Sequence, residues 1–168
     1  NAEWFDLQAV AGDARLAEQL RLYMIEQIEV DRDLLKKMAD TALLKAPPLE
    51  LPLQEEVDLK RSGVVPFVDA VRLYSLAFGV NAQTTAERLR QVASKLKLNP
   101  EDVANWLDAV YFLEQLRIRE QSEYDDNGAH DHILPEKLSD LDQRILKESF
   151  RQVRKLQARL AEDVHSWE

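Results

Sequence analysis

The sequence predicts an all-α protein: an antiparallel up-and-down helical bundle with a helical arm at its N-terminus. Apolar residues recur at the three- and four-residue spacing of amphipathic helices along most of the chain. Only four glycines and six prolines occur among 168 residues, too few for the many tight turns of an all-β architecture. Long helices joined by moderate connections are typical of a bundle.

Two helices are predicted before residue 46. Asp13 can cap a helix that extends to about residue 27, and a second helix is expected over residues 31–45. The residues expected to face inward are Leu16, Leu20, Tyr23, Met24 and Ile28, then Leu34, Leu35, Met38, Ala42 and Leu43. Three prolines between residues 47 and 52 then end the helical pattern. Residues 1–46 are therefore predicted to form the arm, and residues 47–168 the main bundle.

The third helix is predicted from about Val64 to Phe78, with Gly79 at the position that follows a helix end. Apolar residues cover almost every face of this segment, and a helix that is apolar all round is buried. Asp69 and Arg72 lie inside it, one turn apart. A buried charge must be paired or hydrogen-bonded, so these side chains either hold each other or line a polar cavity. The sequence permits both.

Start signals define three further helices. Thr84 and Glu87 form a capping box for a helix that ends near residue 97. Asn99 precedes a proline and two acids and begins a helix to about residue 124, and Ser139 caps the last one. The apolar stripes consist of Trp106, Val110, Leu113 and Leu116 in the fifth helix and of Leu146, Phe150, Val153, Leu156, Leu160 and Val164 in the sixth.

Polar residues interrupt these apolar stripes. Arg117 and Gln121 continue the stripe of the fifth helix, and Gln157 lies within that of the sixth. Together with Asp69 and Arg72 they could form one connected network. One interpretation is a set of local salt bridges with a snorkelling arginine. The other is a ligand pocket among bundle helices, where such sites are commonly built.

Lys60 and Arg61 precede Gly63 and the predicted start of the third helix. Cations beside free amides at a helix N-terminus can bind an anion such as phosphate, although a solvated basic pair has the same pattern. The loop of residues 124–132 contains two histidines and three aspartates. Its spacing fits neither an EF-hand nor a helical zinc motif, so we expect a solvated acidic loop and no metal.

Composition excludes several classes of function. The chain has no cysteine, which excludes disulfides, thiol catalysis and thiolate metal sites. Its net charge of −9 repels phosphate backbones and anionic membranes, and no apolar run approaches the ~20 residues of a membrane span. A cytoplasmic protein without nucleic-acid or membrane partners is expected. The first residues lack a methionine, so we expect a fragment of a longer protein.

Four segments in order resemble a known family, the nucleotidyltransferase substrate-binding domain. They begin with Asp58-Leu-Lys-Arg-Ser-Gly-Val-Val-Pro-Phe-Val-Asp-Ala-Val-Arg72, and continue with residues 85–89, 116–121 and 138–157. The family's domain lies at the C-terminus of bacterial signal-transduction proteins that carry cyclic-nucleotide-binding or CBS modules and then a nucleotidyltransferase domain. The resemblance implies a four-helix bundle related to the C-terminal domain of kanamycin nucleotidyltransferase.

The resemblance also implies site residues and partners. The motif positions carried over as substrate- or phosphate-binding candidates are Asp58, Lys60, Arg61, Asp69, Arg72, Arg117, Arg119 and Gln121, with Gly63 as a further motif position. Glu120 departs from the family pattern, where a histidine is expected. Residues 4–13 resemble the end of a nucleotidyltransferase domain, and Asp6 matches its third catalytic carboxylate. The other two carboxylates have no counterpart here, so the fragment is expected to be non-catalytic.

Two functions from different classes remain open at this stage. The first is substrate recognition or regulation for a nucleotidyltransferase domain in cis, which would grip an acceptor substrate or the nucleotide phosphates. Mg²⁺ and a nucleoside triphosphate are then expected for the full-length protein, with a protein or a small molecule as acceptor. The second is a structural or dimerising helical domain without a ligand. No phosphate loop, Ser-His-Asp arrangement or nucleophile elbow supports an independent enzyme.

Overall fold

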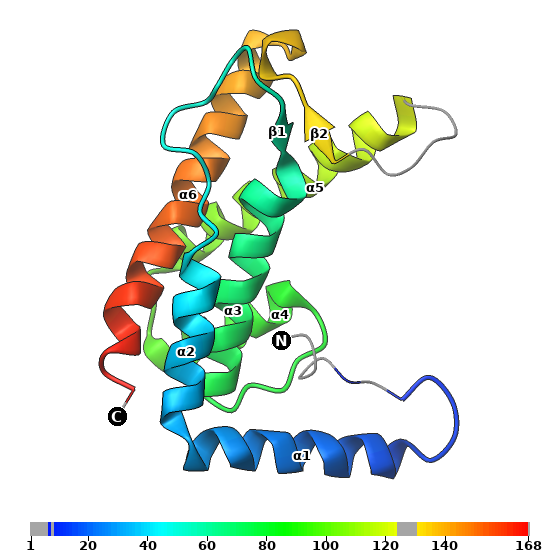
Figure 1. Ribbon diagram of the computed structural model, residues 1–168, viewed down its shortest axis with the longest axis vertical. Coiled ribbons are helices and arrows are strands. Elements are labelled where there is room, and N and C mark those ends of the chain that lie inside the picture. The colour runs from blue at the N-terminus through cyan, green and yellow to red at the C-terminus, as the bar shows by residue number, and fades with distance from the viewer. Residues whose placement is uncertain (1–6, 8, 124–130, 168) are drawn as a thin grey trace.

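The computed structural model describes residues 7, 9–123 and 131–167 and is all-α, as predicted (Figure 1). In chain order its helices are α1 (Ala14–Val30), α2 (Arg32–Leu43), α3 (Val65–Ala77), α4 (Thr85–Leu96), α5 (Pro100–Glu123) and α6 (Asp140–Val164). The strands β1 (Val57–Asp58) and β2 (His132–Ile133) form a two-residue antiparallel ladder, with Val57 opposite Ile133. This ladder was not predicted, because two residues are too few to give a periodic signal.

The helices begin where capping side chains predict. Asp13 and Asp31 accept backbone hydrogen bonds at the starts of α1 and α2, and Ser139 does so at α6. The capping box of α4 is complete, with Thr84 and Glu87 each bonded to the other's backbone. Because each side chain satisfies a backbone N–H that has no intrahelical partner, local sequence is enough to define these boundaries.

The core lies between α2, α3, α5 and α6, with α4 packed against α3 and α5. Figure 1 shows α2, α3 and α6 side by side along the long axis of the molecule. The predicted stripes of α5 and α6 are all buried. Tyr74 and Phe78 of α3 stack against each other and meet Trp167 edge-on, with 5.7 Å between the ring centroids of Tyr74 and Trp167. This aromatic cluster holds the segment after α6 against α3.

The predicted core was wrong for helix α1. Leu16, Leu20 and Tyr23 were expected to face inward, but they are 66%, 49% and 58% exposed. Figure 1 shows the reason: α1 extends away from the bundle and crosses the ends of α2 and α3. Only the part of a helix that meets another element can bury its apolar face. Ile28, near the end of α1 that joins α2, is buried.

Helix α2, which the sequence analysis assigned to the arm, lies beside the helices of the bundle. It packs against α3 and α6, with Leu35 and Ala39 fully buried while the predicted core residue Leu34 is 38% exposed. The division of the chain at residue 46 stays a prediction. Among the described residues, none of the helices combines the length and the apolarity needed to cross a bilayer.

Candidate functional site

The motif from Asp58 to Arg72 begins with a π-helical turn, Lys60–Val64, that runs directly into α3. The predicted helix start at about Val64 agrees with the start of α3 at Val65, but the π-helical turn before it was not predicted. Asp58 Oδ1 accepts a hydrogen bond from the Arg61 backbone N–H at 2.8 Å. Lys60 and Arg61 lie exposed in this first turn, and a carboxylate already contacts one of its backbone donors. This weakens the predicted anion site, because the carboxylate stands where the anion would bind.

Gly63 explains why the π-helical turn fits the core. A Cβ built on this glycine would lie 2.8 Å from Leu113 Cδ1 and 3.1 Å from Phe150 Cε1. Both neighbours are fully buried, so neither can move aside without disturbing the packing. Gly63 is therefore a point of close approach between α3, α5 and α6. Its role in the motif is to let the helices meet.

Asp69 and Arg72 form a pair within α3, as one of the two sequence interpretations predicts. Arg72 Nη1 donates a hydrogen bond to Asp69 Oδ1 at 2.7 Å. The side chain of Arg72 is 9% exposed and that of Asp69 is 19% exposed. The pair satisfies the charges that an apolar helix would otherwise leave buried and unpaired. The ion pair does not fully enclose the Asp69 carboxylate, because Asp69 also lines a cavity.

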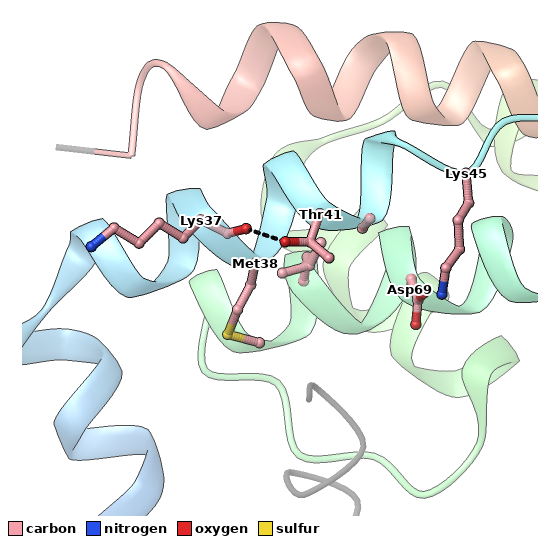
Figure 2. Close-up of a pocket in the computed structure, with 7 residues that line it drawn as sticks. Lys37, Met38, Thr41, Lys45 and Asp69 are labelled. Carbon is pink, nitrogen blue, oxygen red and sulfur yellow. Dashed lines mark hydrogen bonds between the residues drawn. The ribbon is translucent and has the colours of Figure 1, made fainter.

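That cavity lies between α2 and α3 and has a volume of about 240 Å³. Its lining consists of Lys37, Met38, Thr41, Ala42, Lys45, Asp69 and Leu73. Figure 2 shows Lys45 extending from just beyond the end of α2 toward Asp69. The two lysines are exposed, while Met38, Ala42 and Leu73 supply apolar contact surface. A mostly apolar pocket with a few charged groups is the usual form of a small-molecule site.

Hydrogen bonds within α2 and just beyond its end hold the residues that line this cavity in place. Thr41 Oγ1 donates to the Lys37 carbonyl at 2.8 Å, so the hydroxyl is used within the helix. Gln157 of α6 donates to the Lys45 carbonyl at 2.7 Å. Gln157 is 5% exposed and satisfies a backbone carbonyl just beyond the end of α2. The glutamine that was expected in a polar network thus anchors the segment that carries Lys45.

Arg117 and Gln121 form a second group at the other end of α3. Arg117 Nη1 is 2.7 Å from Glu114 Oε2. Its Nε is 2.9 Å from Asp131 Oδ1, close enough for an ion pair but not aligned as a hydrogen bond. Gln121 Nε2 donates to the same Asp131 oxygen at 2.9 Å. In the described contacts, Arg117 and Gln121 thus meet at Asp131 and not at the Asp69–Arg72 pair, which corrects the expectation of one connected network.

Asp131 joins this group to the beginning of the motif. Its carbonyl accepts a hydrogen bond from the Leu59 N–H at 2.8 Å, and the adjacent His132 pairs with Asp58 across the ladder. Arg119 is 46% exposed and reaches Asp142 Oδ2 of α6 at 3.1 Å. These contacts connect α5, α6 and the segment before α3, so the motif positions here support the fold.

Sequence reasoning missed Asp131, because it was counted as part of a solvated acidic loop. One signal was available: the carboxylate follows a predicted helix that ends in an arginine and a glutamine. The rest of the predicted loop, residues 124–130, lies outside the described residues, as does Asp6. In the part of the chain that the structure describes, no group of three or more metal-binding side chains comes together.

A comparison with known protein families matches residues 32–164 to the family described as "Putative nucleotidyltransferase substrate binding domain". The chain belongs to this family. The predicted resemblance is confirmed. The match begins at the first residue of α2 and ends at the last residue of α6, so the family unit is the bundle without α1. Searches of curated proteins and of solved structures gave no significant match.

Membership of this family directs attention to the cavity between α2 and α3. All seven of its lining residues lie inside the matched segment. Of the residues predicted as site candidates, Asp69 lines this cavity and Arg72 pairs with it. Elsewhere, Asp58 bonds to the backbone of the π-helical turn, and three others contact aspartates of neighbouring segments: Arg117, Arg119 and Gln121. Lys37 and Lys45 carried no motif signal in the sequence, because exposed lysines on a helix are ordinary surface residues.

Proposed function

We propose that this chain is the substrate-recognition and regulatory module of a cytoplasmic signal-transduction nucleotidyltransferase. The catalytic domain acts in cis, binds Mg²⁺ and a nucleoside triphosphate, and carries out the transfer. The cavity between α2 and α3 grips the nucleotide phosphates or an anionic acceptor substrate. The observation that carries this proposal is the placement of Lys37, Lys45 and Asp69 around an apolar-lined cavity within the family's own segment.

Each lining residue has a distinct part in this proposal. The ammonium group of Lys45 extends toward Asp69 (Figure 2) and attracts an anionic group, whereas the side chain of Lys37 extends away from the cavity. Asp69, held in position by Arg72, accepts a hydrogen bond from a hydroxyl or amino group of the ligand. Met38 and Leu73 contact its apolar part. None of these residues forms a nucleophile–base pair, so binding and positioning are the chemistry that the site offers.

The test is a ¹⁵N NMR titration of the chain with ATP, GTP and UTP, each with and without Mg²⁺. A panel of small phosphorylated and carboxylated compounds then covers the acceptor. Binding at the cavity should perturb amides of α2 and α3 first. Lys45→Ala should weaken the interaction about tenfold, the scale of one charge-assisted hydrogen bond. Lys155→Ala, on the exposed face of α6, is the matched control and should bind as the wild type does.

If none of these ligands perturbs the amides of α2 and α3, the cavity is rejected as the binding site. Equal weakening by the two lysine variants would also reject it, since it would show attraction by general positive charge. Binding of a ligand elsewhere on the bundle would support the substrate-binding function but would place its site outside this cavity.

A second candidate function, a dimerising helical domain, is favoured by one observation. The face of α1 that carries Leu16, Leu20 and Tyr23 is exposed, and apolar faces of this kind are common at protein interfaces. Sedimentation at increasing protein concentration tests it. A monomer at all concentrations, with α1 intact by circular dichroism, would reject this function.

A further inference from the structure

The cavity between α2 and α3 carries two opposite charges on two different segments. Lys45, just beyond the end of α2, extends toward Asp69 of α3 in Figure 2, and both residues line the cavity. Among the residues that the structure describes, the Asp69 carboxylate forms an ion pair with Arg72 but none with Lys45. The two charges therefore stand apart at the wall of one cavity.

The rest of the fold holds both charges in place. Arg72 Nη1 donates to Asp69 Oδ1 at 2.7 Å. The backbone of Lys45 is bonded on both sides: its N–H donates to the Ala42 carbonyl at 3.3 Å, and its carbonyl accepts from Gln157 Nε2 at 2.7 Å. A site whose charged groups are held in position before binding loses less conformational freedom when a ligand arrives.

The Asp69 carboxylate keeps acceptor capacity for a ligand. An ionised carboxylate has about four lone-pair sites on its two oxygens, and the hydrogen bond from Arg72 uses Oδ1. Within the described part of the chain, Oδ2 accepts no hydrogen bond. The side chain of Asp69 is 19% exposed, so it is accessible from the cavity it lines. An ammonium group of a ligand can therefore bind this carboxylate while Arg72 stays in place.

The size and charge of the cavity favour a small ligand without net charge. Its volume of about 240 Å³ lies below the roughly 300–1,000 Å³ of typical ligand pockets, which favours a molecule much smaller than a nucleoside triphosphate. The formal charges of Lys45 and Asp69 cancel, and the carboxylate would repel a polyanion. Met38, Ala42 and Leu73 offer apolar surface beside these charges. A molecule with one anionic group, one cationic group and an apolar part matches all three features.

We propose that the cavity between α2 and α3 binds a small zwitterion, an α-amino acid with an apolar side chain. Its carboxylate pairs with the Lys45 ammonium and its ammonium group donates to Asp69, while its side chain contacts Met38 and Leu73. This inference rests on the proposed function, in which the cavity grips a substrate, and it names the chemical class of that substrate. It selects an acceptor over the nucleotide phosphates as the occupant.

The test is a ¹⁵N NMR titration of the whole chain with the apolar amino acids from alanine to phenylalanine. The tightest binder is then compared with two analogues that each lack one charge, its amide and its deaminated acid. For leucine these analogues are leucinamide and 4-methylpentanoate. We expect saturable perturbation of amides in α2 and α3 by the amino acid, and binding at least about tenfold weaker for each analogue.

Two variants assign each charge of the ligand to its partner. Lys45→Ala should abolish the preference for the amino acid over its amide, because the carboxylate has lost its partner. Asp69→Asn should abolish the preference over the deaminated acid in the same way. Lys155→Ala, on the exposed face of α6, is the matched control and should keep both preferences. Should Asp69→Asn fail to fold, the two analogues in the wild type and the Lys45→Ala variant decide.

The outcomes distinguish this inference from the proposed function. Saturable binding of a nucleotide or another phosphorylated compound at α2 and α3, without binding of any amino acid, would overturn the inference and leave the proposed function standing. Equal affinity for the amino acid and either analogue would also overturn it, as would equal losses in Lys45→Ala and Lys155→Ala. If neither class of compound perturbs α2 and α3, the inference and the cavity as a substrate site are rejected together.

Discussion

Arg72 and Asp69 are joined across one turn of α3 by a hydrogen bond of 2.7 Å between Nη1 and Oδ1. Asp69 lines the cavity between α2 and α3, and Arg72 lines a small cavity between α1, α3 and α4. The pair thus connects two cavities on different sides of α3. A ligand in the cavity between α2 and α3 that competes for Asp69 would therefore change the contact that Arg72 makes.

Removal of Arg72 should destabilise the fold strongly. Arg72→Ala leaves the 19%-exposed Asp69 carboxylate without its ion pair, and breaking a buried pair costs about 3 kcal/mol or slightly more. Urea unfolding measures the loss. The control is Arg151→Ala, which removes an i,i+3 pair on the exposed face of α6 and should leave stability near the wild-type value. Equal losses in the two variants would show that Asp69 and Arg72 are effectively solvated.

Addition of one methyl group at Gly63 should also destabilise the protein. Alanine favours a helix over glycine by about 1 kcal/mol, so an open site would be stabilised. Here the new Cβ would lie 2.8 Å from Leu113 Cδ1, and overpacking of a full core costs about 1–3 kcal/mol. In the double variant Gly63→Ala/Leu113→Val, the loss should be smaller than the sum of the single losses. A more stable Gly63→Ala protein would contradict the close approach.

Stability should fall at alkaline pH because of Tyr74. Burial raises the pKa of its phenol well above the ordinary 10.0, and the hydrogen bond to Asp163 Oδ2 at 2.8 Å raises it further. The folded state keeps the proton, so this contribution is complete below pH 10 and is lost as the pH rises beyond it. The loss is about 1.4 kcal/mol per pH unit while the folded phenol stays protonated.

The measurement for Tyr74 is urea unfolding between pH 8 and pH 11.5. Tyr74→Phe should be less stable by about 1 kcal/mol at pH 8, where it lacks the hydrogen bond, but its stability should fall less steeply above pH 10. Tyr111→Phe, at an exposed position of α5, is the control and should follow the wild-type curve. Parallel curves for Tyr74→Phe and the wild type would contradict the assignment.

The group around Asp131 should behave as a support for the fold. Asp131→Ala removes the shared partner of Arg117 and Gln121 and should cost about 1–2 kcal/mol. A double-mutant cycle with Arg117→Ala should show coupling between the two positions. Neither variant should change ligand binding at the cavity between α2 and α3. Lost binding with unchanged stability would instead place a ligand site at Arg117.

The chain should not transfer nucleotides by itself. With ATP, UTP or GTP and Mg²⁺ we expect no pyrophosphate release above background, because the family to which the chain belongs is described as a substrate-binding domain. A coupled pyrophosphate assay measures this, with the full-length protein as positive control. Pyrophosphate release by the wild-type chain that is lost in Asp6→Asn would overturn this prediction and would show that catalysis takes place within this chain.

Much of the fold could be predicted from local patterns. Caps such as Thr84 with Glu87 and the stripe from Leu146 to Val164 act within one helix, so neighbouring residues determine them. The spacing of Asp69 and Arg72 within an apolar helix predicted either a pair or a polar cavity, and the structure has the pair.

Tertiary structure decided which apolar faces are buried and which polar residues meet. Leu16, Leu20 and Tyr23 have the spacing of a core stripe, yet they are exposed, because burial depends on whether another element lies opposite. Asp131 pairs with Arg117 across a loop, and Arg21 approaches Arg88 from a helix more than sixty residues away. Helical periodicity describes a single segment, whereas cavities and ion pairs between segments depend on how the segments are packed together.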